Sequence, residues 1–177
     1  MLNERERAKG AALCHRFERA KLRAEIRVFG DAARKILARA RENLARTFLC
    51  TQCRAPLPIS DRFFRSRHVP CPHCNTVNTF VPGTDVLSVE PFCCHRLAQV
   101  AAEAPYFAWL DAEEEMNQGD APEAVAAAER ALRAYQTAYL RARIEIVPEY
   151  EKDFEKDLAG RMAFFYEHRK LARRQAP

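Results

Sequence analysis

Four cysteines have the residue type and the spacing of a metal site. Cys50 and Cys53 form one Cys-x-x-Cys pair, Cys71 and Cys74 form a second, and seventeen residues separate the pairs. Each pair presents two thiolates from one tight turn, and two such turns supply the four ligands of tetrahedral zinc. We therefore predict one structural zinc ion held by these four residues. A site with four protein ligands leaves no open coordination position for a substrate, so catalysis is not expected there.

A short run of strand-forming residues follows each cysteine pair. Leu57 and Ile59 follow the first pair, and Val77 and Phe80 follow the second. With these runs the segment 48–83 resembles the zinc ribbon family, a small β module in which two knuckle hairpins hold one zinc ion. The resemblance covers about a fifth of the chain and implies a compact β segment.

One feature departs from the zinc ribbon pattern. The residue after each knuckle often needs a positive φ and is commonly glycine, but Arg54 and Asn75 occupy those places here. Asparagine tolerates the left-handed region better than arginine does, so some strain is expected in the first knuckle. A mononuclear iron centre of the rubredoxin kind uses similar cysteine pairs and is the alternative occupant, with electron transfer as its function.

Arginine and aromatic side chains are interleaved between the two pairs, at Arg62, Phe63, Phe64, Arg65 and Arg67. One interpretation makes the aromatic rings the small core of the ribbon. The arginines then offset the charge of −2 that four thiolates leave around a dication. The other interpretation makes these five residues a contact surface for nucleic acid or for a partner protein. Both interpretations stay open on sequence grounds.

The remainder of the chain has the composition of long helices. Its 177 residues include only 5 glycines, and charged residues make up 30%. The chain contains no apolar run long enough to span a membrane, and its first residues are charged, unlike a secretion signal. Cysteines with metal-site spacing suit a reducing compartment. We therefore expect a cytoplasmic protein without a membrane segment.

Residues 1–49 are predicted to form one long N-terminal helix, from residue 3 to about residue 48. At about 1.5 Å per residue it would span roughly 70 Å, so it must pack against other helices or another chain. Gly10 and Gly30 are predicted weak points where this helix bends or ends. The expected coiled-coil-like seam consists of Leu22, Ile26, Phe29, Ala33, Ile36, Ala40 and Leu44.

Residues 84–177 are predicted to form a helical hairpin and a kinked helix that pack with the N-terminal helix. Ser88 is expected to cap a helix that Pro105 kinks or splits, and Pro148 is expected to kink or restart a later one. Gly119 suits the end of a helix.

A capping box is predicted directly after this glycine. Asp120 and Glu123 have the spacing in which each side chain satisfies an amide at the start of the next helix. The sequence around Gly119 therefore predicts a tight helical hairpin.

Charge is divided unevenly along the chain, whose net charge is +5. Residues 1–49 carry 13 basic and 6 acidic side chains, whereas residues 84–118 carry one basic and seven acidic ones. We expect the acidic helix, with Asp111 and Glu113 to Glu115, to lie beside the basic one. This pairing would leave little unbalanced charge for nucleic acid.

Three further cysteines lie outside the predicted zinc site, at Cys14, Cys93 and Cys94. Two adjacent helical residues cannot both face one inward point, and Cys14 is expected far along the first helix. We therefore predict structural thiols rather than a second metal site.

Together these features predict a mainly α protein, a long-helix bundle or coiled coil with a small β zinc ribbon inserted at residues 50–83. We expect a non-enzymatic scaffold or adaptor that assembles with a protein partner or with itself and takes no small-molecule substrate. The alternative is a nucleic-acid-binding or transcription-associated ribbon protein.

Overall fold

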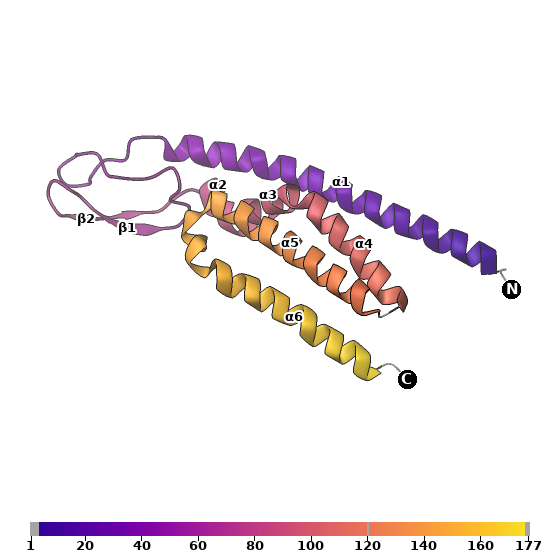
Figure 1. Cartoon of the computed structure of the whole chain (residues 1–177). Helices are drawn as coiled ribbons and strands as arrows, with labels where there is room; N and C mark the ends of the chain where they lie inside the picture. Colours follow the sequence, from indigo (N-terminus) through magenta and orange to yellow (C-terminus); the bar gives the residue numbers. More distant parts are fainter. Residues whose placement is uncertain (1–3, 120, 176–177) are drawn as a thin grey trace.

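The computed structural model describes residues 4–119 and 121–175, with side chains for residues 6–7, 9–119 and 121–167. The protein is mainly helical, with one small antiparallel sheet near one end (Figure 1). The elements are α1 (Glu4–Leu44), β1 (Arg67–Pro70), β2 (Val77–Phe80), α2 (Thr84–Leu87), a π-helical turn η1 (Val89–Cys93), α3 (Cys94–Ala101), α4 (Glu103–Gly119), α5 (Pro122–Ile146), a 3₁₀ turn η2 (Pro148–Asp153) and α6 (Phe154–Gln175).

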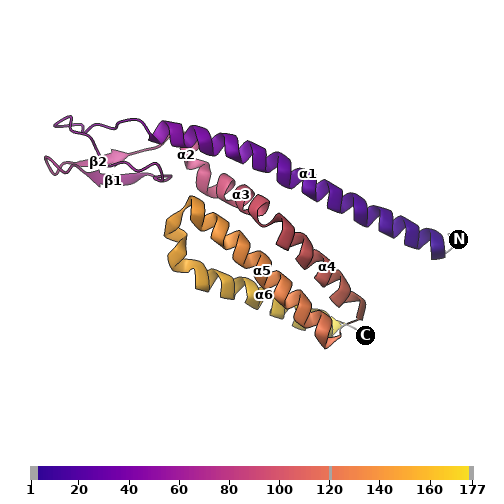
Figure 2. The same ribbon diagram turned by 45° about the horizontal axis from the view of Figure 1, so that its top comes forward.

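Helix α1 is the long N-terminal helix that the sequence predicts, and it ends at Leu44 rather than near residue 48. Its 41 residues span about 60 Å. The C-terminal half packs on α2, η1 and α3, while the N-terminal half extends beyond them (Figures 1 and 2). The buried seam differs from the predicted one: Gly30 and Leu37 are buried, whereas Phe29 is 39% exposed and Leu22 and Ile36 are only half-buried.

Gly30 explains this shift of the seam. A Cβ atom added at Gly30 would overlap Cγ2 of Val100, so α1 and α3 lie too close at this point for a larger residue. Helix α1 continues through Gly30, so it does not end at this predicted weak point. Because Gly30 has no side chain, it leaves room for Val100 of α3 against α1. Phe29 lies beside the contact, with the Arg96 guanidinium 4.3 Å from its ring centroid.

The prolines interrupt the later helices as expected. The helical segment breaks at Ala102, so Pro105 lies in the first turn of α4, where its missing N–H removes no intrahelical bond. Pro148 begins the 3₁₀ turn between α5 and α6. Ser88 occupies the N-cap position of η1, as predicted, but its side chain makes no capping bond there. Its hydroxyl instead donates back to the Thr84 carbonyl of α2 at 2.8 Å.

Two predicted helix starts lie at the edge of what the structure describes. Helix α4 ends at Gly119, and α5 starts at Pro122 and runs back along α4. The predicted capping box involves Asp120, and the long N-terminal helix is predicted to begin at residue 3; both positions lie outside the described part of the chain.

Two hydrophobic clusters hold the fold together. The first joins the ribbon to the helices and contains Ala33, Leu37, Ala40, Leu44, Phe64, Val69, Phe80, Val86, Val89, Cys93, Cys94, Ile146 and Val147. The second joins α3, α5 and α6 and contains Ala98, Ala102, Leu132, Tyr139, Leu140, Ala142, Phe154, Leu158 and Met162. Because Phe64, Val69 and Phe80 pack with helical residues, the segment 48–83 with its two-stranded sheet is continuous with the first cluster rather than an appended module.

Acidic α4 lies beside basic α1, as the charge distribution predicts. Arg19 forms an ion pair with Asp111 at 2.6 Å and lies 3.7 Å from Glu114, and His15 Nε2 lies 3.0 Å from the same Glu114. Arg23 places its guanidinium 4.2 Å from the ring centroid of Phe107. These contacts are made by side-chain ends, so the two helices are linked but not closely packed. Within the described residues, no helix has both the length and the apolarity to cross a membrane.

Candidate metal centre

The four predicted ligands come together at the outer end of the ribbon. The Sγ atoms of Cys50, Cys53, Cys71 and Cys74 all lie within 4.8 Å of one another. Cys50 Sγ is 3.7 Å from Cys74 Sγ, and Cys53 Sγ is 3.6 Å from Cys71 Sγ. Four sulfurs at the usual Zn–S distance of about 2.3 Å lie about 3.8 Å apart in a tetrahedron. The spacing therefore fits one metal ion and is far too long for disulfides.

The two knuckles have the same backbone structure. In the first, the Cys50 N–H donates to the Ala55 carbonyl at 2.8 Å, and the Arg54 N–H donates to the Cys50 carbonyl at 3.1 Å. In the second, the Cys71 N–H donates to the Thr76 carbonyl at 2.9 Å, and the Asn75 N–H donates to the Cys71 carbonyl at 3.0 Å. Arg54 has φ 62° and Asn75 has φ 59°. Both positions after the knuckles thus adopt the left-handed conformation that the sequence pattern predicts.

Asn78 is a site residue that sequence reasoning missed. It is the only buried polar residue among those described, at 5% exposure, and lies on the inner face of β2. Its Nδ2 donates to Cys50 Sγ at 3.6 Å and to the Thr76 carbonyl at 3.0 Å. Its Oδ1 accepts from the Thr51 N–H at 2.9 Å and from the Thr51 hydroxyl at 3.0 Å. Asn78 therefore connects the second hairpin to the first knuckle.

Thr76 is a second link between the knuckles. Its Oγ1 lies 3.3 Å from Cys74 Sγ and 3.2 Å from the side-chain oxygen of Gln52 in the first knuckle. The hydroxyl and then the N–H of Thr76 lower the pKa of Cys74. Backbone N–H groups act in the same way on Cys50, whose pKa falls to about 6, with Cys53 the largest cause. These donors favour the thiolate form that a metal ion requires.

The neighbouring thiols oppose the ionisation of Cys53. The pKa of Cys53 is raised to about 12: the Ala55 N–H acts to lower it, but Cys74, burial, Cys71 and Cys50 together outweigh that effect. Thiolates this close repel one another, so the cluster does not carry four negative charges by itself. A divalent cation would remove that repulsion. Four soft sulfur ligands are suited to bind such a cation.

The arginines and aromatic residues of the ribbon lie mainly against the helices. Phe64 is 1% exposed and belongs to the core, and the Arg67 guanidinium lies 4.5 Å from the Phe63 ring centroid. Arg67 also forms an ion pair with Glu149 at 2.8 Å. The structure thus brings Phe63, Phe64 and Arg67 to the junction with the helical body, whereas Arg62 is exposed.

Arg65 makes the other ion pair across this junction. Its Nε donates to Glu90 Oε2 at 2.6 Å, and the Tyr150 hydroxyl donates to the same oxygen at 3.0 Å. The Arg143 guanidinium in turn lies 4.6 Å from the Tyr150 ring centroid. These contacts join the ribbon to η1, η2 and α5. Sequence reasoning predicted a contact role for Arg65 and had no signal for this glutamate partner, 25 residues away.

The three remaining cysteines do not join the metal centre. Cys93 and Cys94 are fully buried in the first hydrophobic cluster, and Cys14 is exposed on the N-terminal half of α1. Burial raises the pKa of Cys93 to about 11 and that of Cys94 to about 12. Within the described residues, Cys50, Cys53, Cys71 and Cys74 form the only cluster of histidine, cysteine or acidic groups that could hold a metal ion.

The chain was compared with protein-family models, with curated proteins and with solved structures. None of the three comparisons gives a match. The likeness of residues 48–83 to a zinc ribbon therefore rests on the paired knuckles and on the geometry of their four sulfurs.

Proposed function

We propose that this protein is a non-enzymatic zinc-ribbon scaffold or adaptor that assembles with a protein partner. The observation that carries the proposal is the attachment of the ribbon to the helices through a shared core and two ion pairs, Arg65 to Glu90 and Arg67 to Glu149. A module attached in this way is held in a constant orientation. It is suited to present a rigid surface rather than to move during a reaction cycle.

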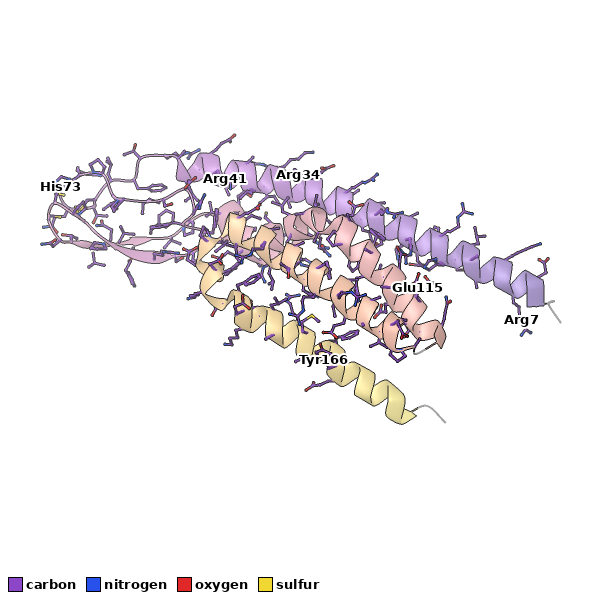
Figure 3. All side chains as sticks on the ribbon, viewed as in Figure 1. Arg7, Arg34, Arg41, His73, Glu115 and Tyr166 are labelled. Carbon is purple, nitrogen blue, oxygen red and sulfur yellow. The ribbon has the colours of Figure 1, made fainter. Side chains whose placement is uncertain are left out.

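The positions of the exposed residues support an assembly role. His73 lies at the outer end of the ribbon, and Arg7 lies near the opposite end of the molecule (Figure 3). Apolar side chains are exposed at both ends, with Val77 62% exposed on β2 and Phe17 65% exposed on α1. An elongated molecule with apolar surface at each end can contact two partners, or one large one, at the same time.

The proposal names zinc as the metal because four cysteine ligands at tetrahedral spacing are typical of structural zinc sites. Metal analysis of protein purified without added metal tests this choice directly. One zinc per chain supports it. A red, iron-containing protein would contradict it and would favour the mononuclear iron alternative.

The assembly role is tested on the tagged full-length chain in its native source, by crosslinking and mass measurement. We expect a complex larger than the monomer whose recovery falls when Cys71→Ser disrupts the ribbon. Cys14→Ser is the matched control because Cys14 is exposed on α1, away from the ribbon. A strict monomer under both crosslinking and light scattering would contradict the proposed function.

Nucleic-acid binding by the ribbon stays a prediction. Arg65 and Arg67, two of the three arginines assigned to it, pair with glutamates of the helical body. Arg62 is left exposed with its backbone N–H bonded to the Ser60 hydroxyl. If the ribbon binds DNA or RNA, affinity falls with salt and with Arg62→Ala. Absence of binding at low salt removes this alternative.

A further inference from the structure

The N-terminal half of α1 carries an apolar stripe that no other part of the described chain covers. From Lys9 to Glu25 every residue is exposed except Arg19 and Leu22, which are half-buried. Helices in proteins are stabilised mainly by packing of an amphipathic face, so a projecting arm of this length is incomplete by itself. The stripe, which we call the outer stripe, consists of Leu13, Phe17, Ala20, Ala24 and Val28.

The outer stripe points away from the body of the protein. Phe17 precedes the buried Ile26 by nine positions, which is about two and a half helical turns, so the two side chains face opposite directions. Leu13 is 66% exposed, Phe17 is 65% exposed and Val28 is 64% exposed. The spacing of four, three, four and four residues keeps the stripe on one face. It therefore forms a second apolar face on α1, whose first apolar face packs against α2, η1 and α3.

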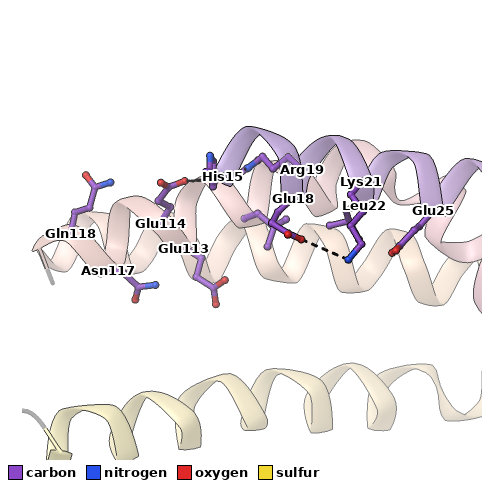
Figure 4. Close-up of a pocket in the computed structure, with 11 residues that line it drawn as sticks. His15, Glu18, Arg19, Lys21, Leu22, Glu25, Glu113, Glu114, Asn117 and Gln118 are labelled. Carbon is purple, nitrogen blue, oxygen red and sulfur yellow. Dashed lines mark hydrogen bonds and ion pairs between the residues drawn. The ribbon is translucent and has the colours of Figure 1, made fainter. Parts of the chain in front are cut away.

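Polar contacts on the opposite side of α1 support the arm without covering this stripe. A groove of about 590 Å³ separates the arm from α4, and its lining includes Leu22 and Leu110 (Figure 4). The ion pairs of Arg19 with Asp111 and of His15 with Glu114 cross it. These contacts link the arm to α4 and leave its outer face exposed.

The side chains beside the outer stripe are basic. If Leu13, Phe17, Ala20 and Ala24 occupy the core positions of a helix pair, Arg16 and Arg23 hold flanking positions on one side and Lys21 on the other. In the chain alone, the Arg23 guanidinium lies over the Phe107 ring and Lys21 Nζ lies 4.0 Å from Glu18, so Arg16 is the flanking charge directed to the stripe. A helix that packs on this face must therefore carry acidic residues at its own flanking positions. Ala20 and Ala24 are small, so it can approach closely and place large apolar side chains over them.

A second copy of this chain does not meet these requirements. In a parallel pair of α1 helices, Arg16 would face Lys21 of the second copy. In an antiparallel pair it would face Arg23. Like charges across a helix interface are destabilising. In both arrangements the two-fold symmetry of the pair produces each like-charge contact twice. The flanking charge thus selects a different protein over self-association.

We propose that the outer stripe is the docking site for an acidic amphipathic helix of a partner protein. This inference rests on the proposed scaffold function and gives the partner its chemical class. The partner helix places leucine-sized side chains over Ala20 and Ala24. Its glutamates or aspartates pair with Arg16, and with Lys21 once that side chain leaves its 4.0 Å contact with Glu18. Association is therefore sensitive to salt and requires both the apolar stripe and its basic borders.

The test uses the full-length, zinc-loaded protein and two synthetic helical peptides of about 24 residues, which span about 36 Å. Both have leucine at the core positions; one has glutamate and the other lysine at the flanking positions. We expect the glutamate peptide to bind at least about tenfold more tightly in fluorescence anisotropy. Phe17→Asp should weaken that binding by at least about tenfold.

A charge exchange makes the test specific. Arg16→Glu with Lys21→Glu should reverse the preference, so that the lysine peptide binds more tightly than the glutamate peptide. The matched control is Arg39→Glu with Arg41→Glu, the same charge change on the same helix about 30 Å away, which should keep the original preference. Far-UV circular dichroism and zinc content check that each variant is folded, and Phe17→Ala provides a milder second variant.

Three results would overturn the inference. The first is equal binding of the two peptides, or no binding of either. The second is a dimer in light scattering that Phe17→Asp dissociates, which identifies a second copy as the occupant. The third is binding of anionic vesicles or duplex DNA, through Phe17 and Arg16, by protein that does not bind the glutamate peptide. If the peptides fail while a native complex still depends on Cys71, the scaffold function stands and only this docking site is rejected.

Discussion

Asn78 Nδ2 donates a hydrogen bond to Cys50 Sγ at 3.6 Å, so a buried amide of β2 supports a ligand of the opposite knuckle. The contact joins residues 28 positions apart, and the same side chain bonds Thr51 and Thr76. Groups that hydrogen-bond to metal ligands orient them and adjust their charge. Asn78 therefore supports the candidate metal centre through hydrogen bonds to one cysteine and to its neighbours.

The first prediction concerns this residue. Asn78→Ala should lower zinc affinity by about 10- to 100-fold, because Cys50 loses its amide donor and Thr51 loses its acceptor. Competition with a chromogenic chelator measures the change. Thr79→Ala, the next residue along β2 and exposed, is the matched control and should bind zinc normally. Equal affinity in both variants would show that Asn78 only fills space.

The second prediction concerns loss of the metal. Cys71→Ser should abolish stoichiometric zinc binding and increase hydrogen exchange over residues 45–83 and over α2 and η1, which share the first hydrophobic cluster. Helices α4, α5 and α6 should stay protected because their contacts involve the second cluster. Mass-detected exchange and metal analysis provide the measurements. An unchanged zinc content would refute the ligand assignment.

The third prediction concerns Gly30. Gly30→Ala should destabilise the protein by about 1–3 kcal/mol despite the better helix propensity of alanine, because its Cβ overlaps Val100. Gly10→Ala is the matched control: a Cβ there meets nothing within 4 Å, so stability should stay equal or rise by up to about 1 kcal/mol. Urea unfolding gives both values.

A double-mutant cycle with Val100→Ala completes this test. The Gly30→Ala change should cost less in the Val100→Ala background, since the overlapping methyl group is gone. A cost that is equal in both backgrounds would mean that α1 and α3 do not meet at this point.

The fourth prediction concerns pH. Burial lowers the pKa of His95, and the charges of Arg96, Arg143 and Arg161 lower it further. The folded protein thus binds this proton less readily than the unfolded chain, so stability falls as pH drops below about 6.5 toward the lower folded value. His95→Gln keeps a partner for Tyr139, which lies 2.7 Å from His95 Nδ1, and should reduce this loss.

Thermal unfolding of both proteins between pH 7.5 and pH 5.5 measures the effect. The melting temperature of the wild-type protein should fall more than that of His95→Gln. Parallel curves would contradict the assignment of this pH dependence to His95.

The fifth prediction concerns thiol reactivity. Of the seven cysteines, Cys14 alone should react quickly with iodoacetamide at neutral pH when zinc is bound. Cys93 and Cys94 should stay slow because they are buried and their pKa values are raised. A chelator should release the four ligands for labelling. Mass spectrometry counts the labels, and rapid labelling of Cys94 with zinc bound would contradict the buried core.

Local signals in the sequence predicted several elements correctly. The metal cluster depends on turns of four residues, so the two Cys-x-x-Cys pairs specify it, and Arg54 and Asn75 mark the left-handed positions. Pro105 and Pro148 interrupt helices because proline lacks an N–H wherever it occurs. Each of these features depends on the conformations available to a few neighbouring residues.

Other features were decided only when distant segments met. The seam of α1 uses Gly30 and Leu37 rather than Phe29 and Ile36, because the side that faces the body is set by where α3 approaches. Apolar character alone favoured Phe29 over Gly30 and could not distinguish Ile36 from Leu37. The exposed outer stripe likewise became visible only once the helices that cover the opposite face were in place.

The sequence by itself determined the local features of this protein: four cysteines in two knuckles, and long helices divided by proline and glycine. The tertiary structure decided which side chains support those features, including Asn78 at the ligands and Glu90 opposite Arg65. The physical reason is that ligand spacing and helix breaks are local backbone properties. Hydrogen-bond partners and packing faces depend on contacts between residues far apart in the chain.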